Sequence, residues 1–358
     1  MVIEKSNRVL IRPKMGRNIA IIVVLCAIGI GGYAYKMFGY VFQPIVKNEC
    51  DIYIGKDATI HSLRDSLLLK DALKDIKAFD FIAKKKKLAG HIKPGKYSLK
   101  KGTIGNNLVN QLIAGNQTPA VVTFNNVRFF PDLAGKVSRH LMADSLQLLT
   151  AVNDTVKMKA FGFTRASYPA MFIPNSYEIY WTSTPDKWVD RMYKEYKRFW
   201  NSSRIKKAKD AKLTPLEVVT LASIVQEEVR HVDEMPKVAG VYMNRLRSGW
   251  PLQADPTIKF ALGDFTISRI LKQDLKIDSP YNTYKYRGLP PGPICFPSIE
   301  AVDAVLNYTK HKYFYFCANK SFDGYHAFAK SYRQHLINAH AYQKELDKRR
   351  IGFKNHRK

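Results

Sequence analysis

The sequence predicts an α+β protein with a single N-terminal transmembrane helix, a small α+β module and a larger mixed α+β domain. Three observations lead to this prediction: one long apolar stretch near the N-terminus, a mixture of strand-like and helix-like segments after it, and a capped helix followed by proline-rich loops. A length of 358 residues is typical of two domains, or of one large domain with an appendage. With 46% hydrophobic and 25% charged residues, the chain can form a packed core.

The apolar stretch predicts a membrane anchor at 19–42. Ile19 to Tyr35 carries no charge, the apolar character resumes at Met37, and the first 18 residues hold five basic residues against one acid. Roughly 20 apolar residues cross a bilayer, and a basic flank keeps the N-terminus in the cytoplasm. The alternative is a cleaved signal peptide ending near Ala34, but the length of the apolar stretch favours an uncleaved anchor. Residues 1–18 are then a cytoplasmic tail, and the remaining chain lies outside the cytoplasm, at the inner membrane.

The charge of the chain is strongly positive. Lysine and arginine number 58 against 30 acids, a formal net charge of +28, which favours an anionic partner. An exported chain does not meet chromosomal DNA, so we expect no nucleic-acid partner and favour the cell wall or anionic phospholipid. The run Lys84–Lys87 is interpreted as a solvated helix end, with a dedicated polyanion site as the alternative. Neither GxGxxG nor GxxxxGK[ST] occurs, and no CxxC pair is present, so we expect no nucleotide cofactor and no metal.

Short strands and helices alternate in the module predicted at 51–118. A strand at 51–55 precedes helical segments at 61–73 and up to Lys87. Pro94-Gly95 predicts a turn before another strand, and the segment 105–114 predicts a helix closed by Gly115. The domain predicted at 119–345 opens with a strand, VVTFNNV, followed by helices. An aromatic segment at 172–184 is expected to be a loop, and 186–200 an amphipathic helix.

The helix that begins near Thr214 contains the candidate catalytic residue. Thr214-Pro215-Leu216-Glu217 forms a capping box. In the helix LEVVTLASIVQEEVRH, Glu228 lies within the apolar arc, whereas Glu227 projects about 100° away and can face water. A carboxyl on an apolar face has a raised pKa, because desolvation disfavours its charged form, and a carboxyl protonated near neutral pH can act as a general acid. The alternative is that Glu228 is neutralised by a lysine or arginine.

The residues after this helix predict a saccharide-binding cleft. Asp233 is expected to cap a second helix, which Gly249 ends. Three loops follow, PLQADPT at 251–257, SPYNTY at 279–284 and GLPPGPI at 288–294. Proline holds such loops rigid, amides and hydroxyls bind the edges of a sugar, and tyrosine rings offer flat faces. The candidate binding residues are Gln253, Asp255, Thr257, Tyr281, Asn282, Thr283 and Tyr284.

These motifs resemble the YceG-like, membrane-bound endolytic peptidoglycan transglycosylases (MltG family). The resemblance extends over about 170–340 and lies in LASIVQEEV, VAGVYMNRLRSGWPLQADPT, SPYNTY, GLPPGPI and YFYFCANKSFDGYHAFAKSYRQH. HIKPGKYSLKKG with LVNQLIAG resembles the LysM-like module of that family, so 51–118 is expected to be LysM-like and 119–345 catalytic. The family pattern departs at Gln226, Gln334 and Leu336, where acids or an asparagine are usual, and matches at His326 and Phe328.

The resemblance implies an activity. Glu228 corresponds to the catalytic acid of the family, and His326 belongs to its cleft. The reaction cleaves the bond between N-acetylmuramic acid and N-acetylglucosamine in peptidoglycan glycan strands and leaves 1,6-anhydro ends, which terminates strand growth without metal or cofactor. Peptidoglycan synthases or division proteins are the implied protein partners. Two alternatives are a hydrolase, with Asp255 positioning a water, and a non-catalytic wall-binding scaffold. Cys295 and Cys317 either pair or, as we favour, are buried apolar residues like Cys50.

Overall fold

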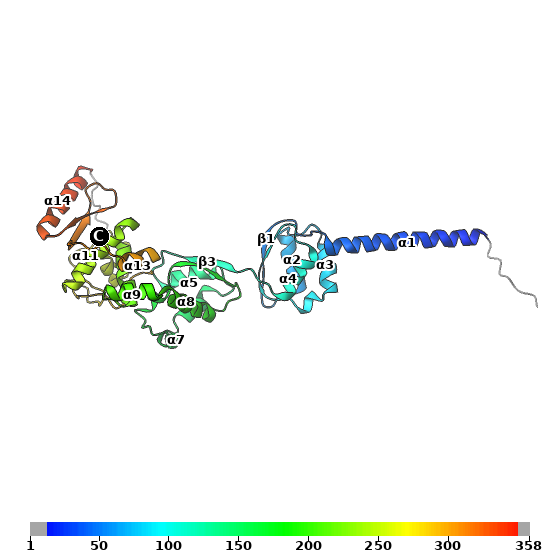
Figure 1. Ribbon diagram of the computed structural model, residues 1–358, viewed down its shortest axis with the longest axis horizontal. Helices are drawn as coiled ribbons and strands as arrows, with labels where there is room; N and C mark the ends of the chain where they lie inside the picture. Colours follow the sequence, from blue (N-terminus) through cyan, green and yellow to red (C-terminus); the bar gives the residue numbers. More distant parts are fainter. Residues whose placement is uncertain (1–12, 350–358) are drawn as a thin grey trace, which may run out of the picture. The chain divides into compact units, whose positions relative to one another are not determined.

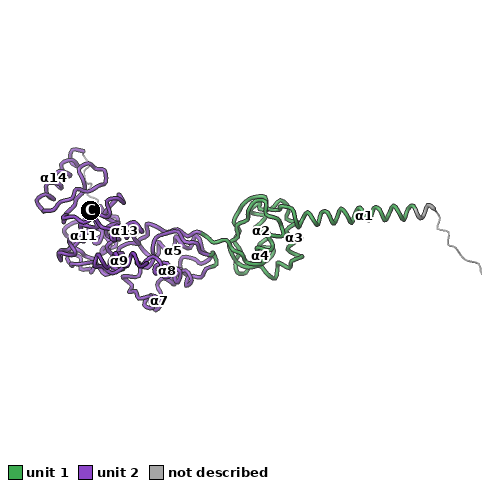
Figure 2. Tube along the Cα trace, viewed as in Figure 1, with its two compact units in different colours: residues 1–120, 180–182 green, residues 121–179, 183–358 purple. Residues whose placement is uncertain are grey.

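The computed structural model describes residues 13–349 (Figure 1). The basic residues Lys5, Arg8 and Arg12 of the predicted cytoplasmic tail lie outside the described residues. The chain forms two compact units (Figure 2): the first ends at Ala120 and also includes Tyr180–Thr182, and the second comprises Val121–Ile179 and the chain from Ser183 onward. Both units mix helices and strands, so the α+β class is confirmed.

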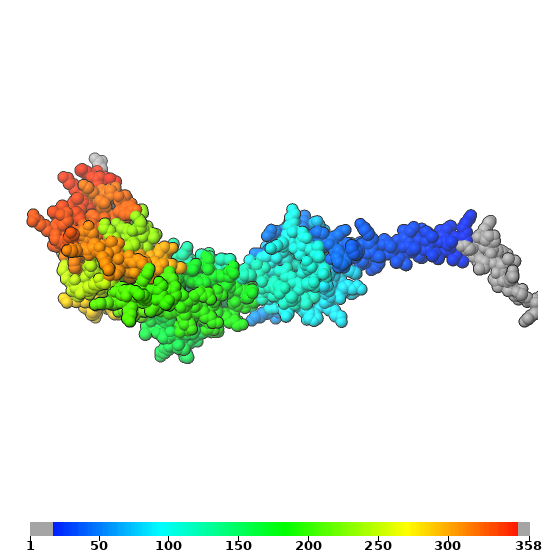
Figure 3. Space-filling model, viewed as in Figure 1, coloured from blue at the N-terminus to red at the C-terminus, as the bar shows by residue number. Residues whose placement is uncertain are grey.

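Helix α1 (Pro13–Phe42) is long and apolar enough to cross a membrane. Its segment Arg17–Phe42 has a mean hydropathy of 2.0, and none of its most apolar 18-residue window is buried inside the protein. The space-filling view shows this helix in blue, projecting from the first unit (Figure 3). The end of the helix belongs to the core of the first unit, because Tyr40 and Val41 pack against its buried side chains. Cleavage near Ala34 would separate the turn that carries Tyr40 and Val41 from the rest of α1. This continuity of the helix into the core favours an uncleaved anchor.

The rest of the first unit is a two-stranded antiparallel sheet with helices. Strands β1 (Cys50–Ile54) and β2 (Gly95–Leu99) pair so that Cys50 lies opposite Leu99. Their inward side chains pack with those of α2 (Ile60–Leu69), α3 (Ile76–Lys85) and α4 (Gly105–Ala114). A 3-10 turn, η1 (Leu88–Gly90), follows the lysine run. Lys84, Lys85 and Lys87 are exposed, as expected of a solvated helix end.

The second unit contains the candidate catalytic region. Its elements in chain order are β3 (Ala120–Phe124), α5 (Phe130–Ser138), α6 (Ser145–Val152), α7 (Thr155–Ala160), η2 (Tyr168–Met171), β4 (Asn175–Ile179), α8 (Pro185–Phe199), α9 (Ser202–Asp210), α10 (Pro215–Glu228), η3 (Val232–Glu234), α11 (Met235–Arg247), α12 (Asp255–Leu262), η4 (Asp274–Lys276), α13 (Ile299–Leu306), β5 (Tyr315–Ala318), β6 (His326–Ala329) and α14 (Tyr332–Lys348). Strand β3 pairs with β4, and β5 pairs antiparallel with β6.

Three local predictions for this unit are wrong. The aromatic segment expected to be a loop contains β4, in which Tyr177 and Ile179 point into the core. Asp255, expected in a loop, is the first residue of α12. Asp233 does not cap α11, because a 3-10 turn precedes that helix; the Asp233 carboxylate instead accepts a hydrogen bond from Tyr325 at 3.1 Å.

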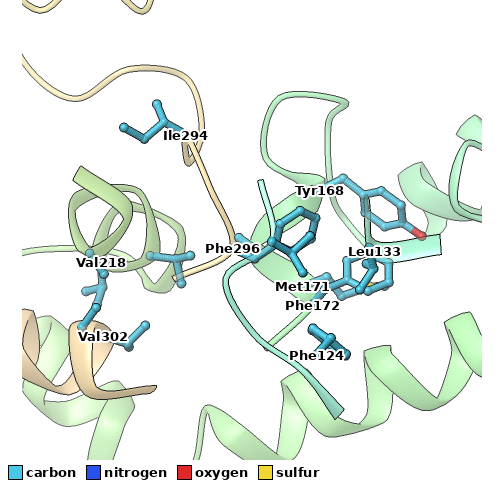
Figure 4. Close-up of a cluster of buried hydrophobic side chains, with 14 of the residues drawn as sticks. Phe124, Leu133, Tyr168, Met171, Phe172, Val218, Ile294, Phe296 and Val302 are labelled. Atoms are coloured by element: carbon cyan, nitrogen blue, oxygen red, sulfur yellow. The ribbon is translucent and has the colours of Figure 1, made fainter. Parts of the chain in front are cut away.

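Helix α10 lies at the centre of the second unit and packs against α11 and α13. All eight residues from Val218 to Val225 are buried. In the close-up of the core, Val218 lies near Val302 of α13, and Phe296 approaches Phe172 (Figure 4). The core therefore holds α10 firmly and fixes the position of its last residues, which carry the candidate acid.

Candidate active site

The sequence around α10 explains why Glu228 lies at the end of a buried helix. The predicted capping box is present: the Thr214 amide donates to Glu217 Oε2 at 2.7 Å, and the Glu217 amide donates to Thr214 Oγ1 at 3.2 Å. Pro215 is the first helical residue. The helix ends at Glu228, and Val229 continues in an extended conformation. The Glu228 side chain thus projects from the last turn of a helix whose middle is inaccessible to solvent.

The surroundings of Glu228 make it a weak acid near neutrality. Burial raises the pKa of Glu228 from 4.5 to about 7, and the negative charge of Asp255 also raises it. A hydrogen bond from Tyr242 Oη to Glu228 Oε1, 2.8 Å long, lowers the pKa in part, because it stabilises the carboxylate. Glu228 still keeps some accessible surface. It can therefore exchange a proton with a bound molecule at neutral pH.

Tyr242 is the main residue that the sequence reasoning missed. It lies on α11 and is fully buried, and burial together with the neighbouring Glu228 raises the pKa of Tyr242 well above its ordinary value. The phenol therefore stays protonated and acts as a permanent donor. One turn later, the buried Arg245 donates from Nε to the Phe314 carbonyl at 2.8 Å. Two polar side chains three residues apart, on the buried face of a helix, were the available signal.

The two residues before Glu228 have other partners. Glu227 forms an ion pair with Arg128, with 2.6 Å between Oε2 and Nη2. Glu227 faces water only in part, because Arg128 covers some of that flank and leaves the Glu227 side chain 23% exposed. Gln226 accepts a hydrogen bond from the Ser298 amide at 2.7 Å, and its amide nitrogen lies 3.7 Å from Cys295 Sγ. Gln226 and Glu227 therefore bind neighbouring segments to the end of α10.

Asp255 and Tyr284 form a second polar pair close enough to Glu228 for their charges to interact. The Tyr284 hydroxyl donates to Asp255 Oδ1 at 2.5 Å, and the Asp255 residue is exposed. Burial raises the pKa of Tyr284 most, and the hydrogen bond to Asp255 raises it further. The exposed Gln253 adopts a left-handed φ of 51°, and its backbone amide donates a hydrogen bond to the Thr283 carbonyl at 3.0 Å. The loop at 251–254 thereby joins the SPYNTY loop.

Three of the predicted binding residues have no free hydrogen-bonding side chain to offer a substrate. Thr257, Asn282 and Thr283 are at most 2% exposed. The hydroxyls of Thr257 and Thr283 lie 2.8 Å apart, and the Asn282 amide donates to the carbonyls of Leu275 and Ile277 at 2.9 and 2.8 Å. The structure does not place these side chains where a substrate can reach them. They hold the loops together instead.

The remaining two predicted residues, His326 and Tyr281, have different neighbours. His326 Nδ1 lies 2.6 Å from Oε2 of the buried Glu234, and the ring of Phe316 contacts both His326 and Tyr242. Tyr281 packs against Phe260 of α12, with ring centroids 4.6 Å apart.

The cysteines are free. Cys295 is buried, whereas Cys50 and Cys317 are half-buried, so the favoured apolar interpretation holds best for Cys295.

A half-buried carboxyl of raised pKa, a tyrosine donor and a nearby exposed carboxylate define a site for acid–base chemistry. The chain matches the YceG-like family over residues 52–341 and belongs to that family. It is 28% identical to an endolytic murein transglycosylase of Bacillus subtilis, covering 86% of this chain and 89% of the relative. It is 27% identical to a Streptococcus pneumoniae protein of the same name, covering 84% of this chain and 60% of the relative.

The fold also has a counterpart among solved structures. The crystal structure of a YceG-like protein from Listeria monocytogenes aligns with a TM-score of 0.53 and 24% identity, covering 81% of this chain and 98% of that one. This likeness supports the mixed α+β architecture.

Proposed function

We propose that this protein is an endolytic lytic transglycosylase that cleaves glycan strands of peptidoglycan. The observation that carries the proposal is Glu228, a half-buried carboxyl with a pKa near 7 at the end of a rigid helix. The names of the relatives supply the substrate, murein, and the type of reaction. The scissile bond joins N-acetylmuramic acid to N-acetylglucosamine.

In the first step Glu228, protonated, donates its proton to the glycosidic oxygen. Protonation of the leaving group is the task of a general acid, and a pKa near the working pH gives both a populated acid and an easy transfer. Tyr242 donates to one carboxyl oxygen, Oε1, so the other is left to carry the proton. The same bond stabilises the carboxylate that forms once the proton has left.

In the second step the C6 hydroxyl of the muramic acid attacks its own anomeric carbon, and the Glu228 carboxylate takes the hydroxyl proton. One residue serves both steps, so no paired carboxylate is needed, unlike in glycoside hydrolysis. Asp255 raises the pKa of Glu228 and, held by Tyr284, is available to bind a sugar hydroxyl. The mechanism uses no metal and no cofactor.

The other side chains that can reach a strand are assigned to binding. Gln253, Tyr281, Tyr284 and His326 are proposed to contact the strand, whereas Thr257, Asn282 and Thr283 keep the loops in place. Residues 51–118 are proposed to form a LysM-like module that holds glycan strands, and α1 to anchor the chain in the inner membrane with both units on the outer side. Peptidoglycan synthases or division proteins are the proposed partners.

Mass spectrometry of the fragments released from isolated glycan strands tests this function. Wild-type protein should release fragments with 1,6-anhydro ends, each one water lighter than a hydrolysis product. Fragments of hydrolytic mass would favour the alternative in which Asp255 positions a water. The absence of any fragments would favour a wall-binding scaffold.

Variants of the two adjacent glutamates test the residue. Glu228→Gln cannot transfer a proton and should lose cleavage by about 10²-fold or more. Glu227→Gln loses only the ion pair to Arg128, so its rate of cleavage should stay within a few fold of the wild-type rate. The reverse result would refute the assignment of Glu228.

A further inference from the structure

A separate cavity of about 360 Å³ borders the site. One wall is apolar and aromatic, formed by Phe130, Phe260, Tyr281 and Phe296, and two arginines, Arg128 and Arg165, also line the cavity. Within the part of the chain that the structure describes, no acidic residue lines this cavity.

The cavity shares its walls with the proposed active site. Arg128 is the ion-pair partner of Glu227, the residue before the proposed acid. Phe260 lies on α12, which begins at Asp255, and Tyr281 lies three residues before Tyr284 in the same loop. A group attached to a sugar bound at Glu228 would therefore find this cavity next to it.

The two arginines leave positive charge in the cavity. The guanidinium of Arg128 is paired with Glu227, yet its Nε is buried and makes no hydrogen bond. Arg165 is exposed and, within residues 13–349, forms no ion pair and no side-chain hydrogen bond. Arg165 therefore supplies a charge that has no acidic partner among residues 13–349, beside an apolar wall.

The position of Arg165 is fixed by its neighbours. Thr164 and Ser167 bond each other on either side of it, with the Thr164 amide donating to Ser167 Oγ at 2.9 Å. The GLPPGPI loop lies so close that a Cβ on Gly292 would be 1.9 Å from the Ala166 carbonyl oxygen. The segment that carries Arg165 is thus packed against the same proline-rich loop that supplies Pro293 to the lining of the cavity.

We propose that this cavity binds the short peptide that the muramic acid residues of a glycan strand carry. This inference rests on the proposed function. Methyl and methylene groups of such a peptide fit the apolar wall, and a free carboxylate of the peptide pairs with Arg165, whose planar guanidinium can bind both carboxylate oxygens. The cavity therefore makes the enzyme prefer peptide-bearing strands over bare ones.

A comparison of two substrates tests the inference. The full chain is given uncrosslinked strands that carry peptides and the same strands after the peptides have been removed. Wild-type protein should cleave the first with the higher kcat/KM. Arg165→Glu should lower that preference about tenfold or more, chiefly through KM. The matched control Arg139→Glu reverses an exposed charge that does not line the cavity and should keep the wild-type preference.

The outcomes separate this inference from the proposed function. If wild-type protein cleaves neither strand, the proposed function fails. If it cleaves both equally, or if Arg165→Glu keeps the preference, the function stands and the peptide site is refuted.

A binding measurement adds a readout independent of cleavage. By calorimetry, the free acidic peptide should bind the wild type and not Arg165→Glu, whereas the same peptide with its carboxylates amidated should bind neither. Equal binding of the acid and the amide would overturn the proposed role of Arg165.

Discussion

At the end of α10, three consecutive side chains have three different environments. Gln226 bonds to the Ser298 amide, Glu227 pairs with Arg128, and Glu228 accepts from Tyr242. Helical geometry alone separates the directions of adjacent residues by about 100°, so the sequence could predict that the two glutamates differ. It could not predict their partners, because Arg128 and Tyr242 come from other elements.

The two groups that act on Glu228 should shift its titration in opposite directions. Tyr242→Phe removes a hydrogen bond to the carboxylate, worth about 1.5–3 kcal/mol for a charged group, so the pKa of Glu228 should rise. The alkaline fall of kcat/KM should then move to higher pH. Asp255→Asn removes a negative charge, so that fall should move to lower pH. Shifts of the same sign in both pH–rate profiles would contradict the role of these residues.

Glu228 should also link stability to pH. Its pKa is raised to about 7 in the folded state, above the ordinary value of 4.5, so the folded state binds the proton more tightly than the unfolded state. Protonated Glu228 therefore stabilises the folded state fully below about pH 4.5, and this stabilisation is lost as the pH rises through about 7. The glutamine of Glu228→Gln does not titrate, so this variant does not lose that stabilisation. As the pH rises between those limits, the free energy of unfolding of Glu228→Gln should therefore increase relative to that of the wild type, by up to about 3 kcal/mol. Urea melts at pH 5 and pH 8 measure this; a constant difference would contradict it.

At the scale of elements, the sequence predicted those whose signals are local. The capping box fixed the start of α10, and Gly115, with φ of 74°, fixed the end of α4. Strand β4 was missed because only two of its five residues, Tyr177 and Ile179, are buried, and its pairing with β3 is distant in sequence. The loop side chains of the candidate site were predicted by type, but whether Asn282 faces a substrate or the protein depends on tertiary contacts.

The contact between the GLPPGPI loop and the segment at 164–167 should be sensitive to one methyl group. Gly292→Ala would place a Cβ 1.9 Å from the Ala166 carbonyl oxygen, so the backbone must shift, and we expect a loss of about 1–3 kcal/mol in the free energy of unfolding. Gly135→Ala is the matched control. It lies within α5, where a Cβ meets nothing within 4 Å, so the change should stabilise by about 0.5–1 kcal/mol. Equal effects in denaturant melts would refute the close packing.

At the scale of the whole molecule, the net charge of +28 lies on a chain that we propose is membrane-anchored and faces the wall. If the lysines attract an anionic polymer, binding to isolated wall material should fall as salt rises past about 0.15 M, where the screening length is about 8 Å. Deleting 51–118 should weaken this binding while the second unit still cleaves soluble strands. Binding that ignores both salt and the deletion would make the first unit a spacer.

The orientation of α1 decides whether either unit can meet the wall. Its N-terminal flank is basic and its last turn packs into the first unit, so the chain from Gln43 onward should lie outside the cytoplasm. A reporter that is active only after export, fused to the C-terminus of the full chain, should be active. Replacing the basic residues before Ile19 by glutamate, and adding lysines after Phe42, should reduce that activity by weakening the charge asymmetry. High activity of a cytoplasmic reporter on the wild-type chain would refute the orientation, and with it the access of Glu228 to peptidoglycan.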